Sequence, residues 1–442
     1  MNKAVGIAEV NQEYLVAAAE RAVPVGYKQT EVGVIPEDWD LQTIGGVAEF
    51  SGGSQPPRST FKFTPRSGYI RLIQIRDYKT SEYETYIPKD LAKKLCSPAD
   101  IMIGRYGPPI FQILRGIEGA YNVALIKVIP KTSIVREYLY YFLKSEKLFE
   151  LMELLSRRSS GQTGVELPAL KSYLIPLPPK KEQTAIANAL SDVDALLSEL
   201  EKLIAKKQAI KTATMQQLLT GRTRLPQFAL REDGSPKGYK QSELGEVPED
   251  WEVFALLGNV TLSHGKAHEQ FVSQAGEFIV VNSKFISSEG SVQKHCTVNF
   301  CPAKKGDVLM VLSDLPNGKA LAKCFYTDAD NIYAINQRVC IFRTNVLDSK
   351  YLFYLLNRHK YFLALDDGVT QTHILNGDIA ACHVFLSREK QEQTAIATIL
   401  SDMDDEIQAL EQRLSKTRQI KQGMMQELLT GKTRLVTPQV AE

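Results

Sequence analysis

The strongest constraint on the fold of this 442-residue chain is an internal repeat. Residues 182–225 and 392–435 are identical at 24 of 44 positions when they are aligned at an offset of 210. A second repeated pair, GYKQTEVGVIPEDW at 26–39 and GYKQSELGEVPEDW at 238–251, has an offset of 212. The stretches between these segments share little identity. The chain therefore contains one unit twice, with a repeated frame and two different inserts.

The repeated segment that follows each insert has the pattern of a coiled-coil helix. Its apolar residues alternate spacings of four and three over nearly three heptads. These seam residues are Ile186, Leu190, Val193, Leu197, Leu200 and Ile204 in the first copy, and Ile396, Leu400, Met403, Ile407, Leu410 and Leu414 in the second. Because two seams of equal length and phase should pair, we predict two helices, each about 57 Å long, in an antiparallel coiled coil.

Each insert combines short strand-like runs with a helix rich in Tyr and Leu. Runs such as YIRLIQIRDY and EFIVVNSKF precede the helical patterns REYLYYFLKSEKLFELM and SKYLFYLLNRHKYFLA. This predicts an α+β fold in which two α/β domains are separated by the two long helices, with a pseudo-two-fold internal repeat. The predicted segments are 1–23 (N-terminal helical segment), 24–180 (first domain), 181–225 (central helix), 226–237 (linker), 238–388 (second domain), 389–435 (C-terminal helix) and 436–442 (tail).

Composition narrows the class of protein. No run approaches the eighteen or more apolar residues of a membrane span, and Glu9, Glu13 and Glu20 interrupt any apolar run of a signal peptide. We therefore expect a cytoplasmic protein. The net charge of +2 is low for a protein that binds DNA alone, so partner subunits are expected to supply phosphate contacts.

Motifs for catalysis, nucleotides or metals are not convincing. The run PLPP at 176–179 lacks the Asn or Asp of a DNA methyltransferase tetrad, and no nuclease cluster of the Asp…Glu-x-Lys type appears. Gly431-Lys432-Thr433 ends a helix, whereas a phosphate-binding loop begins one. All six histidines fall in the second insert together with Cys296 and Cys301, but their spacings match no standard zinc ligand pairs. We predict no catalytic residue, metal or cofactor in this chain.

The loops of the inserts carry residue types that contact base edges, because Arg pairs with guanine and Asn or Gln with adenine. The candidates in the first insert are Ser54, Gln55, Arg58, Arg76, Arg105, Arg157, Arg158, Gln162 and Thr163. Those in the second are Lys266, His268, Asn282, Lys284, Asn317, Lys319, Gln371, Thr372 and His373.

The order GYKQTEVGVIPEDW, variable domain, IPLPPKKEQTAIA, long helix and LLTGRTRL, repeated once, resembles the specificity subunit of type I restriction-modification enzymes. The resemblance covers the chain from Gly26 to Leu435. The second copy departs from the first where VFLSREKQEQTAIA replaces IPLPPKKEQTAIA, which puts the geometry of that junction in doubt.

The resemblance implies two target-recognition domains, each specific for one half of an asymmetric bipartite DNA target. The helices would fix the gap and dock two methyltransferase subunits that methylate adenine, and motor-nuclease subunits would complete the restriction complex. S-adenosylmethionine, ATP and Mg²⁺ would belong to those partners. The alternatives are a specificity module of another restriction or methylation system, and a coiled-coil scaffold with two protein-binding domains.

Overall fold

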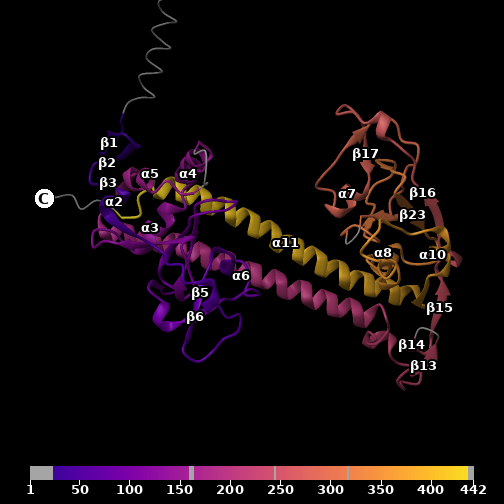
Figure 1. Cartoon of the computed structure of the whole chain (residues 1–442). Helices are drawn as coiled ribbons and strands as arrows, with labels where there is room; N and C mark the ends of the chain where they lie inside the picture. The colour runs from indigo at the N-terminus through magenta and orange to yellow at the C-terminus, as the bar shows by residue number, and fades with distance from the viewer. Residues whose placement is uncertain (1–22, 159–163, 243–244, 316–317, 437–442) are drawn as a thin grey trace, which may run out of the picture. The chain divides into compact units, whose positions relative to one another are not determined.

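The computed structural model describes residues 23–158, 164–242, 245–315 and 318–436 (Figure 1). The chain divides into two compact units, the first formed by Met1–Leu200 with Arg413–Glu442 and the second by Glu201–Gln412. Each unit contains one insert, the start of the long helix that follows it and the end of the other long helix. The predicted N-terminal helical segment lies outside the described residues except for Val23.

The two long helices are α6 (Lys180–Leu218) and α11 (Lys390–Leu428), of 39 residues each. In the second unit, Lys207 of α6 pairs with Glu406 of α11 at 2.6 Å, and Lys211, one turn later, pairs with Asp404. In the first unit, Lys421 of α11 pairs with Asp194 of α6 at 2.5 Å. Residue numbers rise along one helix as they fall along the other, so the predicted antiparallel pairing is confirmed.

The seam of each helix faces inward. All twelve predicted seam residues are buried or half-buried, with Ile186, Leu190 and Leu400 fully buried. Beyond the helix ends, Gly221 and Gly431 adopt the left-handed conformation with φ of 69° and 72°. A Cβ at Gly221 would lie 2.5 Å from the ring of Pro248, so glycine is required both for the backbone turn and for the close packing.

Short strands of the frame flank each insert. In the first unit β1 (Tyr27–Thr30) pairs with β2 (Gly33–Pro36), and β3 (Asp40–Thr43) pairs with β12 (Leu174–Leu177). In the second unit β13 (Tyr239–Ser242) pairs with β14 (Gly245–Pro248), and β15 (Trp251–Ala255) pairs with β25 (His383–Ser387). All four pairs are antiparallel. The β3–β12 and β15–β25 pairs bring the two ends of each insert together.

The inserts share a four-stranded antiparallel sheet despite their low sequence identity. Its strands are, in order, β4 (Ala48–Gly52), β11 (Leu125–Pro130), β8 (Ile101–Gly104) and β9 (Gln112–Leu114) in the first insert. They are β16 (Thr261–His264), β23 (Val339–Arg343), β19 (Val308–Val311) and β21 (Cys324–Tyr326) in the second. The α+β fold class is therefore confirmed.

A second sheet in each insert contains a pair of parallel strands. Its order is β6 (Tyr86–Pro88), β5 (Tyr69–Ile73), β10 (Gly119–Tyr121) and β7 (Leu95–Cys96) in the first insert, and β18 (His295–Cys296), β17 (Phe278–Val281) and β22 (Tyr333–Ile335) in the second. The strands β5 and β10 are parallel, as are β17 and β22. A further short pair, β20 (Ser313–Asp314) and β24 (Thr372–His373), lies in the second insert.

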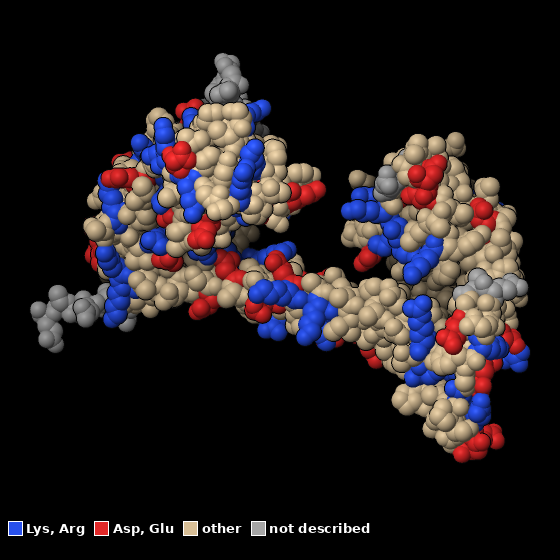
Figure 2. Space-filling view, turned by 60° about the horizontal axis from the view of Figure 1, so that its bottom comes forward, with Lys and Arg blue, Asp and Glu red and all other residues tan. Residues whose placement is uncertain are grey.

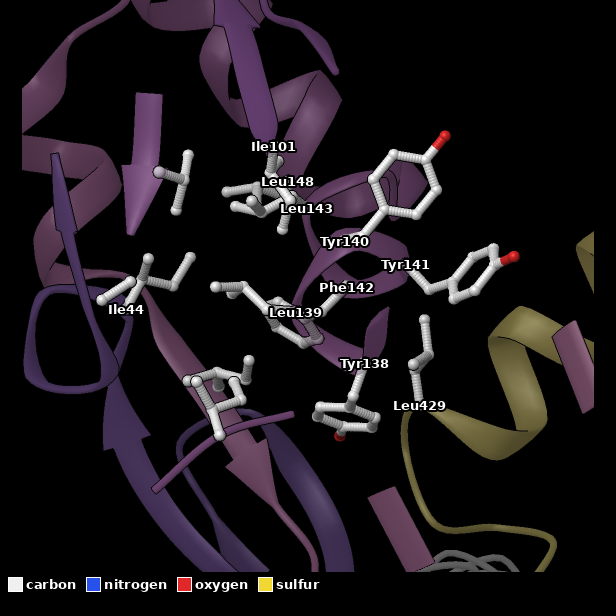
Figure 3. Close-up of a cluster of buried hydrophobic side chains, with 14 of the residues drawn as sticks. Ile44, Ile101, Tyr138, Leu139, Tyr140, Tyr141, Phe142, Leu143, Leu148 and Leu429 are labelled. Atoms are coloured by element: carbon white, nitrogen blue, oxygen red, sulfur yellow. The ribbon is translucent and has the colours of Figure 1, made fainter. Parts of the chain in front are cut away.

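The predicted Tyr/Leu-rich segments are helical and attach each insert to the long helices. The first is divided into α3 (Arg136–Leu143) and α4 (Glu146–Arg158), and the second into α8 (Ser349–Leu356) and α9 (Lys360–Leu363). Figure 3 shows α3 between Ile44 and Leu429, the residue just after α11, with Tyr138 and Leu139 turned into the core. Tyr141 Oη donates to Asp194 Oδ2 at 2.8 Å, and Tyr354 Oη donates to Asp404 Oδ2 at 2.8 Å.

The remaining α-helices of the described residues are short. They are α2 (Ile44–Val47), α5 (Leu167–Ser172), α7 (Ser283–Ser287) and α10 (Asn376–Ala381). The side chain of Asn282 caps α7 by accepting a hydrogen bond from Phe285 N at 2.9 Å.

An arginine closes the frame of each unit; its side chain is 6% exposed in the second unit and 17% exposed in the first. In the second unit, Arg224 donates from Nε and Nη2 to the carboxylate of Glu392 at 2.7 and 3.0 Å, and from Nη1 to Asp250 Oδ1 at 2.7 Å. Trp251 Nε1 donates to the same Glu392 carboxylate at 3.0 Å. We call this group the arginine clamp. Its counterpart in the first unit consists of Arg434, Asp38, Trp39 and Glu182.

The clamp makes the stability of the second unit depend on pH. Burial raises the pKa of Asp250, but hydrogen bonds and positive charge from Arg224 and Lys237 outweigh burial and lower it to about 2, from an ordinary value of 3.8. Because the folded-state pKa is lowered, the stabilisation is present above about pH 4 and is lost as the pH falls toward 2.

We therefore expect the second unit to lose about 1–2 kcal/mol of stability between pH 5 and pH 2 through Asp250, a modest value because this side chain is 28% exposed. Urea unfolding can be followed by the fluorescence of Trp251 in a Trp39→Phe background. The Asp250→Asn variant serves as the control and should show a correspondingly smaller loss. Equal losses in the two proteins would contradict the role of Asp250.

Candidate nucleic-acid interface

In each insert, two parallel strands end side by side at one edge of a sheet. Ile73 of β5 lies opposite Tyr121 of β10, and Val281 of β17 lies opposite Ile335 of β22. The segments that follow are 74–76 and 122–124 in the first insert, and 282–284 and 336–338 in the second. We call them the carboxyl edge of each insert. Strand pairing thus brings together loop residues that are about 50 positions apart in sequence.

A glycine packs a third segment against each carboxyl edge. A Cβ at Gly53 would lie 1.9 Å from the carbonyl oxygen of Asn122, and one at Gly265 would lie 2.1 Å from that of Asn336. Any side chain would collide with backbone, so only glycine fits at these positions. The next residues are held in place, since Ser54 N donates to Tyr121 O at 3.1 Å and Lys266 N donates to Ile335 O at 2.8 Å.

A fourth segment follows the central strand of the antiparallel sheet. Arg105 N, just after β8, donates to Ala124 O at 2.8 Å, and Leu312 N, just after β19, donates to Arg338 O at 2.9 Å. The exposed guanidinium of Arg105 lies over the ring of Tyr106 at 5.3 Å. The two inserts therefore build the same four-segment surface with different side chains.

A polar cavity of about 440 Å³ opens at the carboxyl edge of the second insert. It is lined by Glu269, Asn282, Ser283, Lys284, Ser287, Asp314, Ala320, Asn336, Gln337 and Arg338. Amide, hydroxyl and cationic groups in one concave surface are the groups that proteins use to contact base edges and phosphates.

The carboxylates in this cavity already accept hydrogen bonds from the protein. Glu269 Oε1 accepts from Asn336 Nδ2 at 2.9 Å and from Gln337 Nε2 at 3.1 Å, and the bond from Asn336 is the main cause of the lowered pKa of Glu269. Asp314 Oδ2 accepts from the backbone of Ala320 at 2.6 Å and of Leu321 at 3.2 Å. In Figure 2 the second insert lies at the right of the view, and Lys and Arg side chains gather on one of its sides.

A family model described as the type I restriction modification DNA specificity domain matches residues 36–212 and again residues 248–420, which together make up most of the chain. The chain belongs to this family. It is therefore a DNA sequence-specificity subunit of a type I restriction-modification system, and the inserts are its recognition domains. The predicted family and the predicted function as a DNA sequence-specificity subunit are confirmed.

Two curated relatives match nearly end to end. The MjaVIII specificity subunit of Methanocaldococcus jannaschii is 26% identical over 424 residues, which cover 91% of this chain and 94% of that protein. The putative MjaX specificity subunit of the same organism is 28% identical over 451 residues, with 93% and 97% covered.

Two solved structures share the fold. The S subunit from M. genitalium has a TM-score of 0.55 and 16% identity, and the match covers 88% of this chain and 96% of that one. A chain from a study of complex assembly and conformational transition of the type I R-M system has a TM-score of 0.52 and 15% identity, with 90% and 99% covered.

Several candidate residues of the first recognition domain lie at or beside its carboxyl edge. Ser54 and Gln55 follow the packed glycine, and Arg76 and Arg105 are exposed. Arg76 Nη2 donates to Tyr83 O at 3.2 Å, which fixes the direction of its side chain. Arg58 is exposed in the short helix η1 (Arg58–Thr60). That these residues contact bases stays a prediction.

In the second domain the structure brings Lys266, Asn282 and Lys284 to the carboxyl edge. Gln371 Nε2 donates to Ser313 Oγ at 2.9 Å, and the exposed His373 pairs with Ser313 in the β20–β24 ladder, so this segment lies next to the edge. Lys319 is exposed at the end of the loop that Asp314 anchors.

Two further candidates, besides the helix-capping Asn282, have structural roles, and their side chains are buried. His268 is fully buried, and its Nε2 accepts a hydrogen bond from Phe300 N at 3.1 Å. Burial also lowers the pKa of His268, which favours the neutral ring. Thr372 is buried and donates to Asp366 Oδ1 at 3.1 Å. Neither side chain is presented at the protein surface.

Some candidates cannot be placed. Gln162, Thr163 and Asn317 lie outside the described residues, and only the backbone of Arg157 and Arg158 is described, at the end of α4.

Sequence reasoning missed Gln74, Val123, Gln337 and Arg338 on the carboxyl edges. Each of them lies within two residues of a strand: Gln74 follows β5, Val123 lies between β10 and β11, and Gln337 and Arg338 lie between β22 and β23. The sequence signal that could have identified these residues was therefore their position near the end of a strand. The candidates were instead chosen by residue type, which favoured longer polar loops.

Within the described ranges, no group of three or more His, Cys, Asp or Glu side chains is placed to hold a metal ion. The prediction that this chain holds no metal or cofactor stays a prediction. Among the same residues, no helix is both long and apolar enough to span a membrane.

Proposed function

We propose that each recognition domain contacts one half of an asymmetric bipartite DNA target, and that α6 and α11 set the gap between the halves. The observation that carries this proposal is the pair of carboxyl edges, which have the same backbone plan and different side chains. Where the first domain has Val123 and Ala124, the second has Gln337 and Arg338. A common frame with unlike contact residues fits a target whose two halves differ in sequence.

The proposal includes two methyltransferase subunits docked on the helices. Its support is a pair of exposed apolar side chains at equivalent positions of the repeat, Ile210 on α6 (43% exposed) and Ile420 on α11 (49% exposed). Leu203, which is 38% exposed, lies seven residues before Ile210 and hence on the same helix face. The counterpart of Leu203 in the second copy is Arg413, so the apolar match between the two copies is the pair Ile210 and Ile420. A matched apolar contact on each copy of the frame suits two identical partners.

In this proposal the partner subunits perform the chemistry. The methyltransferase subunits would transfer a methyl group from S-adenosylmethionine to adenine. Motor-nuclease subunits would use ATP and Mg²⁺ to translocate and cut unmodified DNA. The present chain would supply sequence recognition and geometry, with no catalytic residue of its own.

Methylome sequencing tests the proposal. In cells that express the partner methylase, deleting this chain should abolish adenine methylation at one bipartite motif with a fixed gap. Restoring a chain that carries a different insert in place of residues 252–388 should change one half of the motif and leave the other half and the gap intact. Unchanged methylation after the deletion, or a change in both halves after the exchange, would contradict the proposal.

A further inference from the structure

The loop between β22 and β23 in the second domain has a counterpart between β10 and β11 in the first. The two loops share a backbone conformation near their start and differ in the side chains that follow. In both domains an asparagine starts this loop and holds it, since Asn122 Oδ1 accepts from Ala124 N at 3.1 Å and Asn336 Oδ1 accepts from Gln337 N at 2.6 Å. The same asparagines are packed against Gly53 and Gly265 through their backbone carbonyl groups. Only the residues after the asparagine differ between the copies, so the loop can change its chemistry without changing the fold.

Arg338 follows Gln337 in this loop, and its backbone is held by neighbouring strands. Its carbonyl oxygen accepts from Leu312 N at 2.9 Å, and Val339, the next residue, is fully buried in β23. The side chain of Arg338 itself is exposed and lines the polar cavity together with Lys284 and Gln337. The backbone therefore fixes where the side chain of Arg338 leaves the loop.

The nearby acids do not neutralise this cation. Glu269 binds the side-chain amides of Asn336 and Gln337, and Asp314 binds backbone N–H groups of the neighbouring loop. Among the described residues, no carboxylate lies within ion-pair distance of Arg338 or Lys284. The guanidinium of Arg338 thus keeps its planar fork of donors for a ligand outside the chain.

We propose that Arg338 is a specificity-determining residue of the second recognition domain, and that it contacts the O6 and N7 atoms of one guanine in the second half-site. Guanine presents two acceptors at the spacing of the guanidinium fork, and no other base does so in the major groove. Lys284, a point charge on the same cavity, contacts a flanking phosphate. This inference rests on the proposed function, because it takes the second domain to be bound at its half-site.

The two roles predict different behaviour of matched variants. Arg338→Lys keeps the charge but loses the fork, so a base contact should be lost in Arg338→Lys as well as in Arg338→Ala. Lys284→Ala should weaken binding to all sequences alike and reduce the dependence of affinity on salt by about one phosphate contact. Lys305 is an exposed lysine before β19, at the end of the β19–β23 pair opposite to Arg338, and Lys305→Ala is the control for loss of charge.

The experiment uses the complex of this chain with its methylase subunits. The methylome first defines the wild-type motif, and methylation rates are then measured on duplexes that carry each of the four base pairs at each position of the second half-site. We expect both Arg338 variants to lose about tenfold to a hundredfold discrimination at a single G·C position, with the first half-site unchanged. Lys305→Ala should keep the wild-type preference, and thermal unfolding of Arg338→Lys should match wild type.

Three results would overturn the inference: unchanged discrimination in Arg338→Ala, wild-type discrimination in Arg338→Lys, or loss of preference at a position that is not G·C in the wild-type motif. The second of these would identify Arg338 as a phosphate contact. A wild-type complex that methylates no bipartite motif would instead contradict the proposed function, so the two failures can be distinguished.

Discussion

Replacing Arg224 with methionine is expected to lower the free energy of unfolding of the second unit by about 3–5 kcal/mol. The side chain of Arg224 is 6% exposed and that of Glu392 is 1% exposed, so the variant leaves a carboxylate buried without its cation. The hydrogen bond from Trp251 would remain, but one neutral donor compensates little of the cost of burying a charge.

Guanidinium chloride unfolding monitored by tryptophan fluorescence would measure this loss. The chain has two tryptophans, and each belongs to one arginine clamp, so a Trp39→Phe background isolates the signal of Trp251 and hence of the second unit. Adding Glu392→Gln to Arg224→Met should recover part of the loss, because the amide removes the buried charge and keeps an acceptor for Trp251.

The matched control is Arg231→Met. Arg231 also forms a forked ion pair, with Glu249 at 2.7 Å, but the two side chains are 48% and 34% exposed. An exposed ion pair contributes about 1 kcal/mol or less, so this variant should unfold close to wild type. Equal losses in the Arg224 and Arg231 variants would show that burial of the clamp does not determine its contribution.

The clamp also explains why the repeated frame contains charged residues that helix packing does not require. Arg224 follows α6, Glu392 lies in the first turn of α11, and Asp250 immediately precedes β15. The side chain of Arg224 thus connects the segment after α6 to the first turn of α11 and to the start of the recognition domain at β15. The same three groups recur as Arg434, Glu182 and Asp38 in the first unit.

The sequence predicted the parts of the fold that local periodicity determines. Heptad spacing gave the two long helices and the seam, and the repeat gave the division into frame and inserts. The clamp was not predicted, because Arg434 and its partner Asp38 are 396 positions apart. A signal was nevertheless present, since the arginine of TRL, the glutamate of EQT and the aspartate of PEDW are identical in both copies.

The candidate interface was predicted less completely. Residue type selected side chains that are exposed, as at Arg76, Arg105 and Lys284, but it could not show which strands pair. The parallel pairing of β17 with β22 determines that Arg338 lies near Lys284, and no local pattern encodes the pairing of runs more than 50 residues apart. Residue type also selected His268, which the fold uses in its core.

The second large effect concerns the gap in the DNA target. Inserting four residues after Leu200 in α6 and four after Gln412 in α11 should lengthen the gap and leave both half-sites unchanged. These positions are the junctions between the two units in the chain, so the insertions leave the clamp and the recognition domain of each unit intact. Four residues add about 6 Å and about 40° beyond a full helical turn, a change that coiled coils accommodate.

Because B-DNA rises about 3.4 Å and turns about 34–36° per base pair, the added length corresponds to between one and two base pairs, and the added rotation to about one. The methylome of the variant complex should therefore show the same two half-sites with a gap longer by one or two base pairs. The control adds two residues at each junction, which rotates the following part of each helix by about 200° and turns the apolar seam away from its partner. That variant should lose methylation altogether. A four-residue variant with an unchanged gap would mean that the helices do not set the spacing, whereas altered half-sites would mean that the recognition domains depend on the helices for more than their position.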